Sequence, residues 1–210
     1  ASGPLRIGWF SSGGGEGSMG MLEQTVEAIK SGDLNAQIEF LFCNRDRRQR
    51  APTDKFLAYA LRNDIPVVTL SSYKFRQQRG ELPWESLRVV YDEAIIEKLS
   101  SFSPTISVTA GYMLIAPLLC TKYKMINLHP ALPGGPIGTW QDVIWELIRQ
   151  TAQESGTMMH SLTPEVDAGP VLGYSRYPIV GDELDWMWFR IRGRSIEEMK
   201  EKEGETLPLF

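Results

Sequence analysis

The chain has 210 residues, 42% of them hydrophobic and 23% charged, which is typical of a globular domain. A formal net charge of −4 gives no general attraction to nucleic acid, and no apolar run approaches the roughly 18 residues of a membrane span. The opening residues lack a secretory signal, and the two cysteines stand in apolar strings that favour free thiols. We therefore expect a cytoplasmic protein that binds neither membrane nor nucleic acid.

Strand-like and helix-like segments alternate along the chain. Short apolar runs predict strands over residues 5–10, 37–44, 65–70, 105–111 and 123–129. Helical spacing of apolar residues predicts helices over 21–32, 53–63 (with Thr53 or Asp54 as its N-cap), 83–102 and 139–155. Residues 156–163 and 169–180 predict a β-pair, and 183–204 a helical, charged tail. The alternation predicts an α/β fold with a Rossmann-like, mostly parallel sheet covered by helices on both faces, in one domain over 4–210.

The glycine-rich stretch SSGGGEGSMG, residues 11–20, follows the first predicted strand and precedes the first predicted helix. Its backbone amides are suited to a phosphate group at a helix N-terminus. A tight turn without a ligand is the simpler alternative. The pattern G-x-G-x-x-G at Gly15, Gly17 and Gly20 also admits a dinucleotide, but no acidic residue ends the second strand as that site requires. The negative charge of Glu16 counts against an anion.

A second group of polar residues begins at the end of the last predicted parallel strand, residues 123–129. Asn127 and His129 stand two residues apart, so on a strand both side chains point to the same side. Asp167 lies in the loop PEVDAGP, residues 164–170, between the paired β-segments. This trio suits acyl transfer to an amine: Asn127 and His129 would donate hydrogen bonds to a developing oxyanion, and Asp167 would accept the proton that the amine loses. On the pattern alone, a histidine at the end of a strand is more often a structural cap, and this interpretation of His129 stays open.

Three stretches resemble the folate-dependent formyltransferases, most closely the branch that acts on glycinamide ribonucleotide. They are INLHPALP (126–133), GTMMHSLT (156–163) and PEVDAGP (164–170). TAGYM (109–113) and FCNRD (42–46) are similar to further family segments, so the resemblance covers nearly the whole chain. It implies the formyltransferase fold and transfer of a formyl group from 10-formyltetrahydrofolate to a primary amine.

The resemblance also implies a role for particular residues. The implied catalytic residues are Asn127, His129 and Asp167. The implied folate contacts are Met113, Leu114, Ile115, Ala116, Glu165, Val166 and Asp167. The implied substrate-phosphate contacts are Gly14, Gly15, Glu16 and Gly17. The expected partner is a small molecule carrying a phosphate and a primary amine, and a homodimer is left open. The missing extra domains of the tRNA-directed and deformylase branches favour the ribonucleotide branch, and purine synthesis as the process.

The chain also departs from the family pattern. Residues 13–17 read GGGEG where the family has Gly-x-Gly-Ser-Asn, and Leu114 stands where the family often has Arg. These departures keep three alternatives open: another acceptor such as an amino sugar nucleotide, hydrolysis of the donor to formate, and a folate-binding module without catalysis.

Three other features have a plain structural interpretation beside a functional one. His160 is interpreted as a packed histidine, with contact to the folate pocket as the alternative. The basic run RDRRQR, residues 45–50, is interpreted as a solvated loop, with an anion contact as the alternative. Two histidines and two distant cysteines lack the spacing of metal ligands, so no metal is expected.

Overall fold

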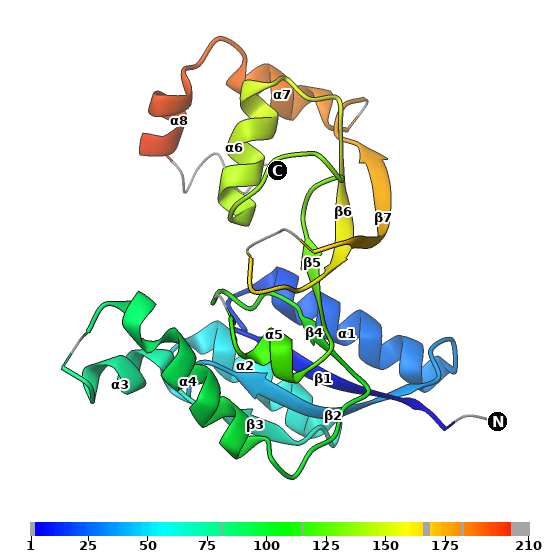
Figure 1. The fold of residues 1–210 in the computed structure, drawn as a ribbon. Helices are drawn as coiled ribbons and strands as arrows, with labels where there is room; N and C mark the ends of the chain where they lie inside the picture. Colours follow the sequence, from blue (N-terminus) through cyan, green and yellow to red (C-terminus); the bar gives the residue numbers. More distant parts are fainter. Residues whose placement is uncertain (1–2, 81, 115, 166–168, 182, 203–210) are drawn as a thin grey trace. The chain divides into compact units, whose positions relative to one another are not determined.

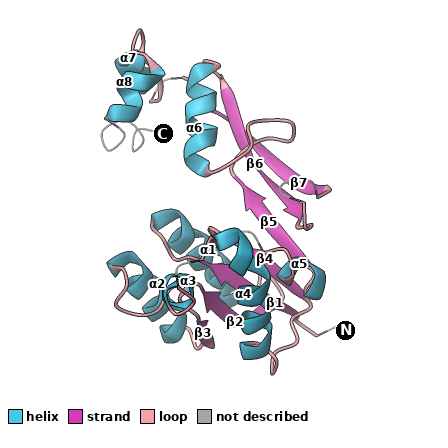
Figure 2. Cartoon of the chain, turned by 60° about the vertical axis from the view of Figure 1, so that its left-hand side comes forward, coloured by secondary structure: helices cyan, strands magenta, loops and turns pink. Residues whose placement is uncertain are grey.

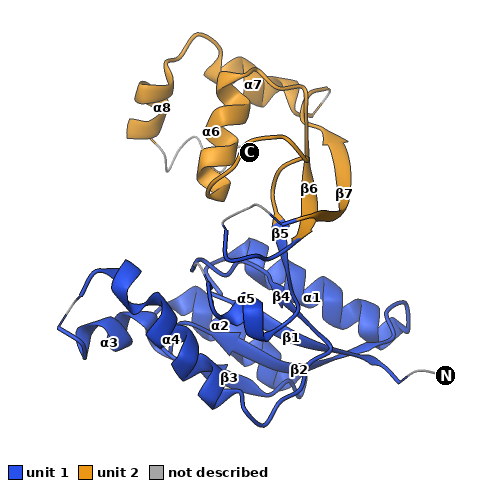
Figure 3. Cartoon of the chain, viewed as in Figure 1, with its two compact units in different colours: residues 1–128, 161–169 blue, residues 129–160, 170–210 orange. Residues whose placement is uncertain are grey.

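The structure is a computed structural model that describes residues 3–80, 82–114, 116–165, 169–181 and 183–202. The chain divides into two compact units (Figure 3). Unit 1 comprises Ala1–Leu128 and Ser161–Gly169, and unit 2 comprises His129–His160 and Pro170–Phe210. Each unit is described separately, and the single domain expected over 4–210 stays a prediction.

Unit 1 is built on five parallel strands (Figures 1 and 2). They are β1 (Leu5–Ser11), β2 (Ala36–Cys43), β3 (Val67–Thr69), β4 (Ile106–Thr109) and β5 (Met125–His129), whose last residue belongs to unit 2. Their order across the sheet is β3-β2-β1-β4-β5, with parallel pairing at every step. After β1 the chain adds β2 and β3 on one side of that strand, and it then crosses to add β4 and β5 on its other side. This reversal is the topological switch point at which such sheets bind ligands.

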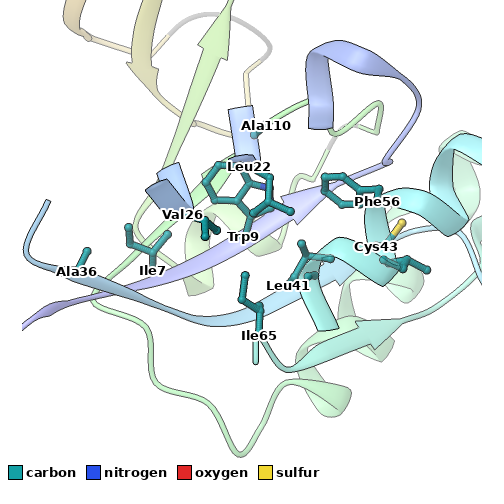
Figure 4. Close-up of a cluster of buried hydrophobic side chains, with 12 residues drawn as sticks. Ile7, Trp9, Leu22, Val26, Ala36, Leu41, Cys43, Phe56, Ile65 and Ala110 are labelled. Carbon is teal, nitrogen blue, oxygen red and sulfur yellow. The ribbon is translucent and has the colours of Figure 1, made fainter. Parts of the chain in front are cut away.

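Five helices complete unit 1: α1 (Glu16–Ser31), α2 (Ala51–Arg62), α3 (Ser72–Gln77), α4 (Trp84–Lys98) and α5 (Leu119–Lys122). They cover both faces of the sheet because strand side chains alternate between the faces. One cluster joins Trp9 of β1 and Leu41 of β2 to Leu22 of α1 and Phe56 of α2 (Figure 4). A second cluster contains the adjacent strand residues and side chains from the other helices: Phe10, Phe40, Phe42, Phe75, Tyr91, Ile95 and Leu119.

Unit 2 contains α6 (Trp140–Arg149), β6 (Glu154–Ser161), β7 (Val171–Pro178), α7 (Asp185–Ile191) and α8 (Ile196–Glu201), with the end of β6 assigned to unit 1. Strands β6 and β7 pair antiparallel. A small core of Trp145, Ile148, Ile191 and Met199 joins the three helices. Among the described residues, no helix combines the length and the apolar content that crossing a membrane requires. The prediction of an α/β fold with a mostly parallel sheet and helices on both faces is confirmed.

Several predicted boundaries were wrong. The helix expected from residue 21 begins at Glu16, inside the glycine-rich stretch. The helix expected over 139–155 starts as predicted, since Thr139 caps it through a capping box with Asp142, but it ends at Arg149. Thr151 has a left-handed backbone with φ of 49°, which helical residues do not adopt, and β6 follows. The charged tail over 183–204 forms two short helices, separated at Gly193 with φ of 76°.

The cap predicted for the second helix was also wrong. Arg50 is the N-cap of α2, and the helix begins one residue later. Thr53 instead donates its hydroxyl hydrogen bond to the carbonyl of Gly13 at 3.0 Å. Asp54 accepts a hydrogen bond from the backbone N–H of Arg48 at 2.7 Å. Both side chains therefore form hydrogen bonds to the backbone of neighbouring loops and do not cap the helix.

Gly156, which opens the GTMMH motif, has no room for a side chain. A Cβ on this residue of β6 would lie 2.2 Å from the carbonyl oxygen of Ser175 and 2.5 Å from Leu132. Because one of these atoms belongs to the backbone of the paired strand, we expect Gly156→Ala to destabilise the protein by about 2–3 kcal/mol. Gly173→Ala on β7 is the matched control, since a Cβ there meets nothing within 4 Å. Denaturant midpoints measure the difference, and equal midpoints for the two variants would contradict the close approach.

Candidate functional site

The loops that follow β1 and β4 meet at the switch point of the sheet. The backbone N–H of Ser12 donates to the carbonyl of Gly111 at 2.9 Å, and Ser12 Oγ accepts from the backbone N–H of Met113 at 3.0 Å. Ser12 is completely buried. One serine therefore joins the glycine-rich loop, predicted to bind phosphate, to the segment predicted to bind folate.

The start of the glycine-rich loop is held in one conformation by hydrogen bonds and by space. Gly13 has a φ of 56°, and a Cβ there would lie 2.9 Å from the ring of Phe56. Its backbone N–H donates to Ser11 Oγ at 3.1 Å, and its carbonyl accepts from Thr53 Oγ1. Only glycine satisfies both the left-handed backbone and the contact with the ring.

Gly14 to Gly17 form the junction with the 16-residue helix α1. Gly15 is its N-cap and, as a glycine, supplies no side-chain cap to the first turn. A Cβ on Gly15 or Gly17 would meet nothing within 4 Å, so the junction is open on that side. Uncapped amides and the positive end of the helix dipole favour an anion here. Glu16 lies in the same first turn and opposes that preference.

Arg45 adds a positive charge to this loop. It follows β2, and its Nη1 donates to the carbonyl of Ser12 at 2.9 Å. Burial, and after it the charge of Arg50, lowers the pKa of Arg45, although the guanidinium stays charged at neutral pH. Within the described part of the chain, Arg45 has no ion pair with a carboxylate. Arg45 is thus partly buried against the glycine-rich loop, whereas Arg47 and Arg48 are exposed, and an anion contact for Arg45 stays a prediction.

Asn127, the middle residue of β5, is held by the neighbouring strand β4. Its Oδ1 accepts a hydrogen bond from Thr109 Oγ1 at 2.6 Å. Thr109 is the last residue of β4, and it is buried. Because the oxygen of the carboxamide faces Thr109, its NH₂ group, the hydrogen-bond donor of the side chain, is directed away from that residue.

His129 ends β5 and belongs to unit 2, where it is buried with 4% of its surface exposed. Its Nε2 lies 2.9 Å from the carbonyl oxygen of Pro136. A carbonyl oxygen only accepts hydrogen bonds, so Nε2 carries a proton. In the neutral ring Nδ1 is then an acceptor, and in the imidazolium both nitrogens donate.

The remaining predicted residues are placed as follows. Met113 is half exposed, while Leu114 and Ala116 pack into the second hydrophobic cluster of unit 1. Glu165 is exposed. Ile115, Val166 and Asp167 lie outside the described residues. His160 is 1% exposed on β6, in agreement with a packed histidine.

Other chemistry has less support. In the described part of the chain, no cluster of three or more His, Cys, Asp or Glu side chains is arranged to hold a metal ion. Burial raises the pKa of the Cys43 thiol to about 11, so it stays protonated and a poor nucleophile at neutral pH. Unit 2 has a cleft of about 550 Å³ lined by charged side chains of α6 and α8, but none of the predicted site residues lines it.

Sequence reasoning missed Ser12, Thr109 and Asp92. Asp92, on α4, is a buried carboxylate that accepts hydrogen bonds from the backbone N–H groups of Leu118 and Leu119. A serine, a threonine and an acidic residue in a helical pattern are too common for any of the three to stand out in the sequence. Their partners are distant in the sequence, and only the folded chain reveals them.

Comparison with known proteins gives a consistent result. Residues 6–192 match the family model described as Formyl transferase. The phosphoribosylglycinamide formyltransferase of Escherichia coli (strain K12) is 26% identical over 180 residues, 81% of this chain and 74% of that protein. The enzyme of the same name from Schizosaccharomyces pombe is 26% identical over 199 residues, 91% of this chain and 86% of that protein. The crystal structure of glycinamide ribonucleotide transformylase 1 from Geobacillus kaustophilus superposes with a TM-score of 0.65 at 27% identity, covering 94% of this chain and 89% of that one.

Proposed function

Because this chain belongs to the formyl transferase family, we propose that it transfers a formyl group from 10-formyltetrahydrofolate to the primary amine of glycinamide ribonucleotide, a step of purine synthesis. The family match over residues 6–192 carries the proposal, and it confirms the formyltransferase resemblance. The acceptor is proposed from the relatives named above. A cytoplasmic location, a homodimer and the absence of nucleic-acid partners stay predictions.

The proposed chemistry assigns one task to each polar residue. The donor supplies the formyl group, whose carbon the acceptor amine attacks. Asn127 and His129 donate hydrogen bonds to the formyl oxygen as it gains negative charge. Asp167 accepts the proton that the amine nitrogen loses as the new carbon–nitrogen bond forms. The bond from the formyl carbon to the folate nitrogen then breaks, and that nitrogen is protonated as tetrahydrofolate leaves.

The acceptor phosphate is proposed to bind at Gly14–Gly17 beside Arg45. The uncapped first turn of α1 supplies backbone donors, and Arg45 supplies the charge that offsets Glu16. The folate side of the proposed site is the segment with Met113, Leu114 and Ala116, joined to the loop through Ser12. Glu165, Ile115 and Val166 are proposed folate contacts on the family resemblance.

Replacing Arg45 tests the phosphate proposal. We expect Arg45→Gln to raise the KM for glycinamide ribonucleotide about tenfold or more, because a charge-assisted hydrogen bond to phosphate is lost. The kcat is expected to change little, because Arg45 has no part in the reacting bonds. Arg47→Gln removes the same charge from an exposed neighbour and is expected to leave KM unchanged. KM values raised equally in the two variants would show that charge near the loop matters and that the position of Arg45 does not. A wild-type KM in Arg45→Gln would contradict the contact between Arg45 and the phosphate.

The function itself is tested by mixing the protein with 10-formyltetrahydrofolate, with and without glycinamide ribonucleotide, and following tetrahydrofolate release. Turnover that depends on the ribonucleotide is the expected result. Formate release without any amine would indicate hydrolysis of the donor. Donor binding without turnover would contradict this acceptor. It would leave a different amine, such as an amino sugar nucleotide, or a folate-binding module without catalysis, and turnover with another amine would distinguish the two.

A further inference from the structure

We infer that Ser12 and Asp92 are positioning residues. They hold the described parts of the run from Gly111 to Leu119, which are Gly111–Leu114 and Ala116–Leu119, in the conformation that binds the formyl donor. The inference rests on the proposed function, because this run contains Met113, Leu114 and Ala116, three of the proposed donor contacts.

Ser12 holds the beginning of the run. Its backbone N–H and its Oγ bond to Gly111 and Met113, as described above, and its carbonyl oxygen accepts from Arg45. Gly111, between β4 and this contact, has a φ of 69°, and a Cβ on it would lie 2.3 Å from Ser18 Oγ. The turn after β4 therefore has no room for a side chain at Gly111. The hydrogen bonds of Ser12 fix the backbone direction from this turn to Met113.

Asp92 holds the end of the run. Its Oδ2 accepts from the backbone N–H of Leu118 at 2.9 Å and of Leu119 at 3.0 Å, where α5 begins. Only 2% of the Asp92 surface is exposed. Burial raises the pKa of this carboxyl, and the two backbone hydrogen bonds act in the opposite direction. Burying a carboxylate costs more free energy than burying an apolar side chain of similar size. What an apolar side chain could not do is accept the two backbone hydrogen bonds, and these fix the conformation at Leu118 and Leu119.

Between the anchors, the side chain of Met113 is half exposed, whereas Leu114 and Ala116 pack inward. Neither anchor is one of the residues proposed to contact the reacting groups. Loosening an anchor is therefore expected to weaken donor binding and to leave the chemical step largely intact.

Hydrogen exchange of the ligand-free protein tests the anchoring. We expect Ser12→Ala to speed exchange of the Met113 amide about tenfold, and Asp92→Asn to speed that of Leu118 and Leu119 by a similar factor, because each amide loses or weakens its acceptor. Ser107→Ala is the matched control for the serine. Ser107 is also completely buried, and its Oγ has no hydrogen-bond partner among the described residues. Glu93→Gln, at an exposed position beside Asp92, is the control for the carboxylate.

Donor binding tests the functional part. We expect each anchor variant to raise the Kd for 10-formyltetrahydrofolate about tenfold, with kcat at saturating donor within about threefold of the wild-type value. The KM for glycinamide ribonucleotide is expected to stay unchanged in Asp92→Asn, which lies away from the phosphate loop. The two variants act at opposite ends of the run, so the inference stays testable if one of them fails to fold.

The outcomes separate this inference from the proposed function. Unchanged exchange at the three amides would overturn the anchoring. Faster exchange throughout unit 1 would overturn it too, because it would show a general loss of stability. Local loosening with an unchanged donor Kd would overturn the positioning role while the proposed function stands. A wild-type protein that binds no donor would overturn the proposed function, and with it the inference.

Discussion

Asp167→Asn is expected to lower kcat about a thousandfold, because the amide cannot accept the proton that the attacking amine loses. Donor binding is expected to remain measurable, since asparagine has almost the same size and shape. The rate is measured as tetrahydrofolate release at saturating 10-formyltetrahydrofolate and glycinamide ribonucleotide. A direct titration gives the Kd for the donor.

The matched control for this prediction is Asp64→Asn. Asp64 is exposed and has a φ of 58°, a backbone conformation that asparagine also tolerates. This variant makes the same chemical change away from the proposed site, so its kcat should equal that of the wild type. An Asp167→Asn enzyme that retains more than about a tenth of the wild-type kcat would exclude Asp167 as the base, since general-base catalysis is worth at least about a hundredfold.

His129→Gln is expected to lower kcat about a hundredfold, the effect of losing one donor to an oxyanion. Glutamine can still donate a hydrogen bond to the carbonyl of Pro136, the observed partner of Nε2, but it has no N–H at the position of Nδ1 that could donate to the formyl oxygen. The rate is measured as tetrahydrofolate release at saturating 10-formyltetrahydrofolate and glycinamide ribonucleotide.

His160→Gln is the control for this second prediction. His160 is the only other histidine in the sequence, and it is equally buried, on β6. We expect its replacement to lower the thermal stability and to leave kcat largely unchanged. If the two variants have the same kcat, His129 takes no specific part in the reaction.

The fold class could be predicted because it depends on local patterns. Trp9 and Phe10, adjacent on β1, enter opposite hydrophobic clusters, so a run of apolar residues identifies a strand buried on both faces. Regular alternation of such strands with helical spacing then requires parallel pairing with helices on both sides. The glycine-rich loop and Asn127 stood out for a related reason, because the loop follows β1 and Asn127 lies near the carboxyl end of β5, while their roles in binding and catalysis stay predictions.

Segment ends and supporting contacts could not be predicted, because they depend on partners far away in the sequence. Threonine is a residue type favoured at helix N-caps, but the hydroxyl of Thr53 donates to the carbonyl of Gly13, 40 residues earlier. The predicted helix over 139–155 ends early because its last residues continue into the pairing of β6 with β7. Local propensity is weak compared with such tertiary hydrogen bonds, and boundaries shift accordingly.

The sequence by itself thus determined the α/β architecture, the family and the polar residues proposed for the chemistry, since all of these are expressed in periodicity and short motifs. Only the tertiary structure showed that Ser12 bonds to Met113 across 101 residues and that Arg45 lies against the glycine-rich loop. It also showed that the buried Asp92 carboxylate caps α5. A hydrogen bond between distant residues has no local pattern, because it depends on how the sheet brings the ends of different strands together.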